Sequence, residues 1–146
     1  MKNTPIVRLM CVDDNELLAA AIEKRISLEP HVHWAGWLSQ TDDLLDHLAQ
    51  TKADIVLLDI DMPGRSAFDV IGDLAEAAPD VRVIIFSGHV RGDYIDRAIE
   101  AGAWGYVSKS DGIDEMLAAV ARVASGEFAL SPEVQIEQQR KMRLPI

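Results

Sequence analysis

The sequence predicts an α/β fold: a doubly wound, five-stranded parallel sheet with helices on both faces. Short apolar runs alternate along the chain with longer segments of helical period, and this strict alternation is typical of βα units joined by right-handed crossovers. Three of the runs, VRLMCV, IVLL and VRVIIF, are almost continuously apolar and rich in β-branched residues. Strands that are covered on both faces of a parallel sheet have this pattern.

The elements follow one another in a regular order. Apolar positions repeat at helical spacing after each strand, and Gly102 and Gly126 stand where the last two helices should end. The expected strands are residues 6–12, 34–38, 55–58, 81–86 and 105–107, and the expected helices lie within residues 17–26, 44–49, 68–75, 94–101 and 113–124.

The segment after Gly126 departs from this alternation. Its Ser131-Pro132-Glu133 is typical of a helix start, but the residues that follow are polar and have little apolar period. We therefore expect one domain over residues 1–126 and a solvated linker or extra helix over residues 127–146.

Composition limits the classes of function. The chain has 146 residues, of which 49% are apolar and 26% charged, so it is long and apolar enough to bury a core and is not a disordered chain. Its net charge of −10 repels phosphate backbones, which argues against nucleic-acid binding by this domain itself.

The expected location is the cytoplasm. No apolar stretch approaches the ~20 residues that span a bilayer, and the N-terminus lacks the apolar segment of a signal peptide, so we expect no membrane contact. The single cysteine, Cys11, cannot form an internal disulfide and lies in an apolar run, which favours an inert thiol in a reducing compartment.

Polar and charged side chains follow four of the five strands. Because the carboxyl ends of parallel strands meet at one edge of the sheet, these side chains should converge. They are Asp13 and Asp14 after the first strand, Asp59 and Asp61 after the third, Ser87 at the fourth and Lys109 at the fifth.

This set of residues suits magnesium-assisted phosphoryl transfer. Clustered carboxylates repel one another and need a cation, and oxygen ligands select a hard one, so Asp13, Asp14 and Asp59 predict a Mg²⁺ site in which Mn²⁺ could substitute. A carboxylate beside such a cation can also attack phosphorus, and Asp59 on the central strand is the best placed to do so. Lys109 and the Ser87 hydroxyl would neutralise the remaining phosphoryl oxygens.

In this combination the chain resembles the receiver domain of a two-component response regulator. The matching motifs are Asp13-Asp14, LLDIDMPG at residues 57–64, Ser87-Gly88 and GAWGYVSK at residues 102–109. The similarity covers about residues 5–126 and implies a flavodoxin-like topology with strand order 2-1-3-4-5. The stretch GEFALSPEV at residues 126–134 is similar to the end of receivers in LuxR/NarL-type DNA-binding regulators.

The resemblance implies a role for each site residue. Asp59 would be the phosphoacceptor, Asp14 a direct magnesium ligand, Asp13 a partner acting through water, and Asp61 a ligand through its backbone carbonyl. Lys109 would pair with the phosphoryl group, Ser87 would hydrogen-bond it, and Tyr106 would be the aromatic residue whose ring moves inward when Ser87 moves. One departure concerns the loop after the fifth strand, where Ser110 replaces the cis-proline that follows the lysine in many receivers.

The implied partners are a sensor histidine kinase as phosphodonor and a second copy of the chain. The dimer would form through the fourth helix, fifth strand and fifth helix, or through the first and fifth helices. The chain would be a phosphoryl acceptor with magnesium-dependent self-phosphorylation and autodephosphorylation, not an enzyme with a separate substrate. The output would be transcriptional, through a DNA-binding domain for which the 20 residues after Gly126 leave no room. A stand-alone receiver is the alternative.

Three rival classes share part of the pattern. Haloacid-dehalogenase-like phosphatases also use an Asp-x-Asp motif with a serine, a lysine and an acidic pair, but their nucleophile follows the first strand and their acidic pair comes last. A flavodoxin-like flavin carrier needs a phosphate-cradling loop after the first strand, where this chain has CVDDNE. A receiver that binds partners without phosphorylation would not need the complete set of site residues.

Overall fold

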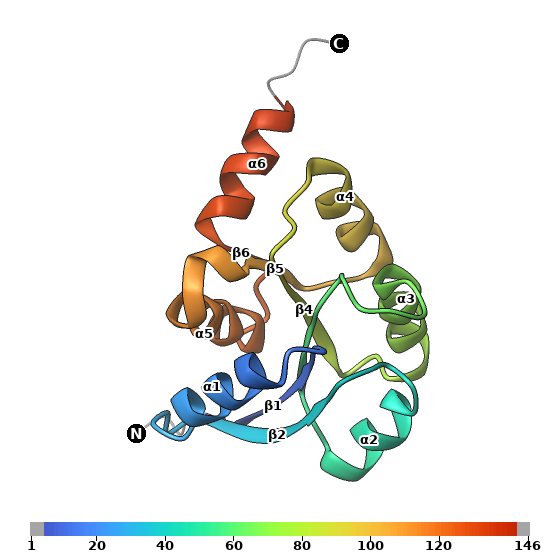
Figure 1. The fold of residues 1–146 in the computed structure, drawn as a ribbon, viewed down its shortest axis with the longest axis vertical. Coiled ribbons are helices and arrows are strands. Elements are labelled where there is room, and N and C mark those ends of the chain that lie inside the picture. The colour runs from blue at the N-terminus through green and yellow to red at the C-terminus, as the bar shows by residue number, and fades with distance from the viewer. Residues whose placement is uncertain (1–4, 143–146) are drawn as a thin grey trace.

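The computed structural model describes residues 5–142, in which parallel strands alternate with helices along the chain (Figure 1). The order of the elements is β1 (Val7–Val12), α1 (Glu16–Ile26), β2 (Val32–Leu38), α2 (Leu44–Thr51), β3 (Ile55–Leu58), α3 (Ala67–Ala77), β4 (Arg82–Ser87), α4 (Gly92–Ala101), β5 (Gly105–Ser108), the 3₁₀ turn η1 (Lys109–Asp111), α5 (Gly112–Ala124), β6 (Ala129–Leu130) and α6 (Pro132–Met142).

The strands form one sheet in the order β2-β1-β3-β4-β5-β6, and every neighbouring pair is parallel. In Figure 1, α1 and α5 lie on one side of this sheet and α2, α3 and α4 on the other. The predicted α/β class and the strand order 2-1-3-4-5 are therefore confirmed. The sheet has one strand more than the five expected.

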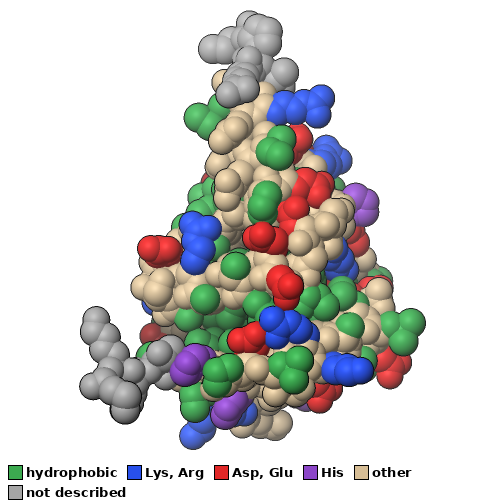
Figure 2. All heavy atoms as spheres, turned by 90° about the vertical axis from the view of Figure 1, so that its left-hand side faces the viewer, with side chains coloured by type: hydrophobic (Ala, Val, Ile, Leu, Met, Phe, Trp, Pro, Cys, Tyr) green, Lys and Arg blue, Asp and Glu red, His purple; other side chains and the backbone are tan. Residues whose placement is uncertain are grey.

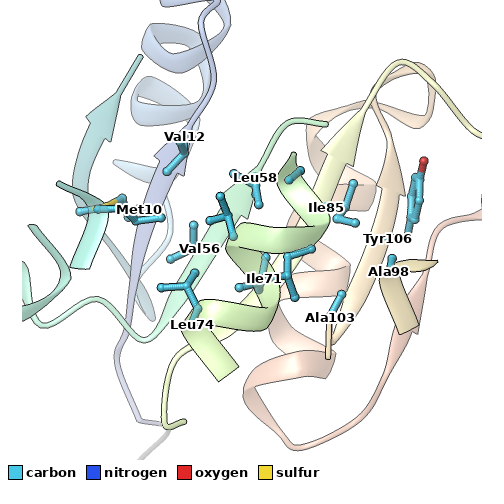
Figure 3. Close-up of a cluster of buried hydrophobic side chains, with 14 of the residues drawn as sticks. Met10, Val12, Val56, Leu58, Ile71, Leu74, Ile85, Ala98, Ala103 and Tyr106 are labelled. Atoms are coloured by element: carbon cyan, nitrogen blue, oxygen red, sulfur yellow. The ribbon is translucent and has the colours of Figure 1, made fainter. Parts of the chain in front are cut away.

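Side chains of each central strand alternate between two buried clusters. In β1, Leu9 and Cys11 pack with α1 and α5, whereas Met10 and Val12 pack with the helices of the opposite face, which Figure 3 shows around Leu58 and Ile71. A strand of this kind has no solvent face, which explains why the strand sequences read as continuous apolar runs. The Cys11 thiol is also buried, and burial raises its pKa to about 12, so it stays protonated at neutral pH.

The register of the strands sets where the functional side chains lie. Val12 pairs with Leu58, so β1 and β3 end level with each other, and Ser87 pairs with Ser108 at the ends of β4 and β5. The residues that follow these strands consequently leave the sheet at one edge. Because β1 lies between β2 and β3, this edge includes the point where the strand order reverses, which is where open parallel sheets bind ligands.

The segment after Gly126 contains a helix, which was one of the two alternatives expected from its sequence, but it is less solvated than that sequence suggested. Ala129 and Leu130 pair with Gly105 and Tyr106 as the sixth strand, and α6 follows. Val134 of α6 is fully buried in the cluster that contains Tyr106. The one buried apolar residue of this helix is Val134, and a search for apolar period does not detect a helix anchored in this way.

The surface seen from the left of Figure 1 is mixed. Basic side chains are scattered there among acidic and hydrophobic ones (Figure 2). Within residues 5–142, none of the helices combines the length and the apolar character needed to cross a membrane.

Candidate functional site

Three carboxylates meet at the carboxyl edge of the sheet. Asp13 follows β1 and Asp59 follows β3, and these residues are 2% and 4% exposed, respectively, while the neighbouring Asp14 is exposed. One oxygen from each carboxylate lies within 4.8 Å of the others. This cluster consists of oxygen donors alone and opens to solvent at Asp14, so it suits a hard divalent cation.

Backbone hydrogen bonds fix the two buried carboxylates. The Asp59 amide donates to the Val12 carbonyl at 3.1 Å, which extends the β1–β3 ladder to the site residue itself. The Asp13 carboxylate accepts from the Asn15 amide at 2.9 Å, and the Asp59 carboxylate accepts from the Asp61 amide at 3.3 Å. These two hydrogen bonds orient both carboxylates at the edge of the sheet.

Lys109 brings the opposite charge to the cluster. Its Nζ lies 2.8 Å from Asp13 Oδ2 and 3.6 Å from Asp59 Oδ2. Burial alone would lower the pKa of Lys109, but its hydrogen bond to Asp13 and the charges of Asp59 and Asp13 outweigh burial and raise it. The ammonium therefore remains charged at neutral pH and offsets one of the three carboxylates.

Asp59 is the carboxylate whose ionisation is disturbed. Burial raises its pKa above the ordinary aspartate value, Lys109 counteracts this, and the charge of Asp13 adds to the rise. A buried carboxylate whose ionisation is disturbed by burial and by a specific cationic neighbour is a candidate functional group.

Ser87, Asp61, His89 and Tyr106 form a second group beside the cluster. The buried Ser87 hydroxyl donates to Asp61 Oδ2 at 3.4 Å and accepts from the His89 amide at 3.0 Å. The Asp61 carboxylate also contacts His89 Nδ1. The Tyr106 hydroxyl donates to the His89 carbonyl, and its ring is buried, which raises its pKa. Residue 89 thus joins the serine and the tyrosine.

Ser87, Asp61 and Tyr106 were expected from the sequence, but their contacts and the part of His89 were not. His89 and Asp61 each stand two residues beyond a strand-end site residue, and β3 and β4 are neighbours, so the pair could have been anticipated. Trp37 also reaches the site, since its Nε1 donates to the Asp13 carbonyl at 2.7 Å. Its strand, β2, lies beside β1 at the register Cys11 to Trp37, which places the indole next to the site.

The loop after β5 has a trans peptide between Lys109 and Ser110, since residues 5–142 contain no cis bond. Lys109 begins the turn η1, and the Ser108 hydroxyl accepts from the Ser110 amide at 3.1 Å as its cap. The serine that departs from the common Lys-Pro pattern therefore supplies an amide that the cap uses.

The chain matches a known protein family over the residues that form this site. Residues 9–121 match the model of the response regulator receiver domain, which accounts for most of the chain. The chain belongs to the response regulator receiver family. Receiver domains are signalling modules of two-component systems, and the strand-end carboxylates and lysine described above lie within the matched residues.

Curated relatives are regulators of the same kind. The response regulator GacA of Pseudomonas aeruginosa is 28% identical over 138 residues, which are 94% of this chain and 64% of GacA. The nitrate/nitrite response regulator NarL of Escherichia coli is 27% identical, with 90% of this chain and 61% of NarL covered. The chain thus spans less than two thirds of the length of these two relatives.

Solved structures confirm the fold of the receiver. A LuxR-family two-component response regulator from Aurantimonas sp. SI85-9A1 superposes with a TM-score of 0.87 at 26% identity, covering 94% of this chain and 98% of that one. The receiver domain of the putative NarL of Mycobacterium tuberculosis gives 0.77 at 26% identity, with 84% and 99% covered. The expected resemblance to LuxR/NarL-type receivers is confirmed.

Proposed function

We propose that this receiver accepts a phosphoryl group on Asp59 from a sensor histidine kinase in the cytoplasm and in response switches an output surface. The observation that carries the proposal is the placement of Asp59: a buried carboxylate with a raised pKa, 3.6 Å from the Lys109 ammonium and within reach of Asp13 and Asp14. Few structural roles would require three carboxylates and a lysine to be gathered at the switch point of a sheet.

Each residue has a defined task in this reaction. An Asp59 carboxylate oxygen attacks phosphorus while the donor's leaving group departs with the bonding electrons. Lys109 then exchanges part of its contact with Asp13 for a phosphoryl oxygen. A bound Mg²⁺, or Mn²⁺ in its place, would neutralise further phosphoryl charge. Asp14 and Asp59 would hold that ion directly, with Asp61 through its backbone carbonyl and Asp13 through water.

The switch would start at Ser87. Its hydroxyl now donates to Asp61, and it would turn toward the phosphoryl group once Asp59 carries one. Because the His89 amide donates to Ser87 and the His89 carbonyl accepts from Tyr106, a movement of the serine would reach the tyrosine through one residue. The added charge acts by favouring one of two existing arrangements, as any ligand does.

The output follows from the family. Relatives such as the transcriptional regulatory protein DegU of Brevibacillus brevis are named for transcription, and we propose the same destination for the signal received here. The switched surface would bind a second copy through α4, β5 and α5 or through α1 and α5. This chain's net charge of −10 does not favour DNA contact by the receiver itself.

The proposal is tested by intact mass after incubation with acetyl phosphate, with and without MgCl₂. We expect a single labile phosphoryl adduct that depends on magnesium. Absence of an adduct in both conditions would contradict the proposal and favour a module that binds partners without phosphorylation.

Magnesium binding should also be visible in tryptophan fluorescence. The Trp37 indole donates to the Asp13 carbonyl at 2.7 Å, so a cation bound at Asp13 and Asp14 should change its emission. A titration with MgCl₂ is expected to give a saturable change that is lost in Trp37→Phe and kept in Trp34→Phe. A change of equal size in the Trp37→Phe variant would refute the assignment of the signal to this indole.

A further inference from the structure

The loop that carries Lys109 is bonded to the C-terminal segment of the chain. Ser131 Oγ accepts from the Ser108 amide at 2.9 Å, and Glu133 Oε2 accepts from the Ser108 hydroxyl at 2.7 Å. Ser108 is fully buried and Ser131 is 3% exposed, so the bond between these two serines forms away from water, and the bond to Glu133 is partly buried. The acceptor in the second bond is a carboxylate oxygen, and charge-assisted hydrogen bonds are stronger than bonds between neutral groups.

These bonds hold the residues that precede and follow Lys109 in the chain. The Ser108 hydroxyl that donates to Glu133 also accepts from the Ser110 amide, so the residue before the lysine fixes the residue after it. Farther along η1, the Asp111 carboxylate accepts from the Glu133 amide at 3.0 Å. Glu133 therefore contacts the turn at both of its ends, once through its side chain and once through its backbone.

The C-terminal segment is itself held independently of this turn. The Ser131 amide donates to the Tyr106 carbonyl at 3.1 Å, which continues the β5–β6 pairing. Val134 is fully buried, and Figure 1 shows α6 continuing from β6 at the edge of the sheet. At the far end of α6, Lys141 forms an ion pair with Asp96 of α4. Glu133 is consequently presented by a packed element.

We propose that Glu133, acting through Ser108, is a positioning residue for Lys109, so that the start of α6 supports the phosphorylation site. The proposal rests on the function proposed above. The Lys109 ammonium must lie near Asp59 while the phosphoryl group is transferred. Its position depends on the backbone of the turn η1, which sets the direction of the Lys109 side chain. A small misplacement of a group that binds transition-state charge lowers the rate strongly.

The experiment measures the rate of phosphorylation by acetyl phosphate at saturating MgCl₂, by intact mass over time, on the full chain. Glu133→Ala removes the acceptor of the Ser108 hydroxyl and should slow the reaction about tenfold. Glu133→Gln keeps a side-chain oxygen that can accept the same bond and should recover most of the rate. Glu137→Ala removes the same charge one turn farther along α6, where its carboxylate only approaches Arg140 at 4.0 Å, and should leave the rate unchanged.

A double-mutant cycle separates positioning from general destabilisation. Ser108→Ala should slow the reaction at least as much as Glu133→Ala, and the double variant should be no slower than Ser108→Ala, because both residues act through one hydrogen bond. Thermal unfolding of each variant shows whether it is folded, and if Glu133→Ala does not fold, the loss of rate in Ser108→Ala together with the rate kept in Glu133→Gln tests the same hydrogen bond.

Different outcomes overturn different statements. A parent chain that is phosphorylated together with a Glu133→Ala variant of equal rate would refute the positioning role alone. Equal losses in Glu133→Ala and Glu133→Gln, or in Glu137→Ala, would also refute it, since the effect would then follow the charge of α6 and not the hydrogen bond. A parent chain that takes up no phosphoryl group would refute the proposed function and this inference with it.

Discussion

Replacement of Asp59 by Asn is expected to abolish phosphorylation completely. The amide has nearly the shape of the carboxylate but no anionic oxygen to attack phosphorus, and no other carboxylate of the site is placed both at the end of the central strand and beside Lys109 at 3.6 Å. Intact mass after incubation with acetyl phosphate and MgCl₂ should show the adduct on the parent and none on the variant.

The variant should fold as well as the parent. Burial, partly opposed by Lys109, raises the pKa of Asp59, so ionisation of this carboxyl destabilises the folded state. A carboxyl with a raised pKa in the folded state stabilises that state at low pH and loses this contribution as the pH rises through the folded pKa. In magnesium-free buffer the unfolding temperature of Asp59→Asn relative to the parent should therefore increase as the pH is raised through this range.

The matched control removes a carboxylate from the same edge of the sheet. Asp61→Asn loses the charge that faces His89 and Ser87, and it should still carry one phosphoryl group after the incubation. An adduct on Asp59→Asn, or its loss from Asp61→Asn alone, would place the acceptor elsewhere and refute the assignment.

The residues that reach the site by strand geometry could be predicted from the sequence. Continuous apolar runs reveal buried parallel strands, and a charged residue directly after such a strand has to emerge at the carboxyl edge. Asp13, Asp59 and Lys109 were found in this way, and the structure brings them together. For these residues the apolar pattern of each strand agrees with the strand's place in the sheet, so the pattern alone was enough to predict where they lie.

Contacts that depend on the exact path of a loop could not be predicted. The strand β6 has only two residues and is held by backbone hydrogen bonds, which leave no mark in the side-chain pattern. The helix α6 buries Val134 and little else, so its sequence reads as polar and solvated. The bond from Ser108 to Glu133 joins residues 25 apart and requires both of these elements to be in place.

Lys109→Met is expected to tighten magnesium binding and slow phosphorylation. The ammonium lies 2.8 Å from Asp13 and 3.6 Å from Asp59, so it competes with any cation at these carboxylates, and its removal leaves them uncompensated. The same ammonium would bind a phosphoryl oxygen in the transition state, and losing one preorganised group of this kind lowers rates on the order of 100-fold. Methionine keeps most of the unbranched stem of lysine without its charge, so packing changes little.

Two measurements made on one sample decide the outcome. Tryptophan fluorescence during a MgCl₂ titration gives the affinity, and intact mass over time at saturating MgCl₂ gives the rate. Lys24→Met, which removes an equal charge from the exposed end of α1, serves as the control for net charge. If Lys109→Met bound magnesium more weakly than this control, the lysine would be organising the carboxylates instead of competing for them. A rate equal to that of the control would mean that Lys109 does not touch the phosphoryl group in the transition state.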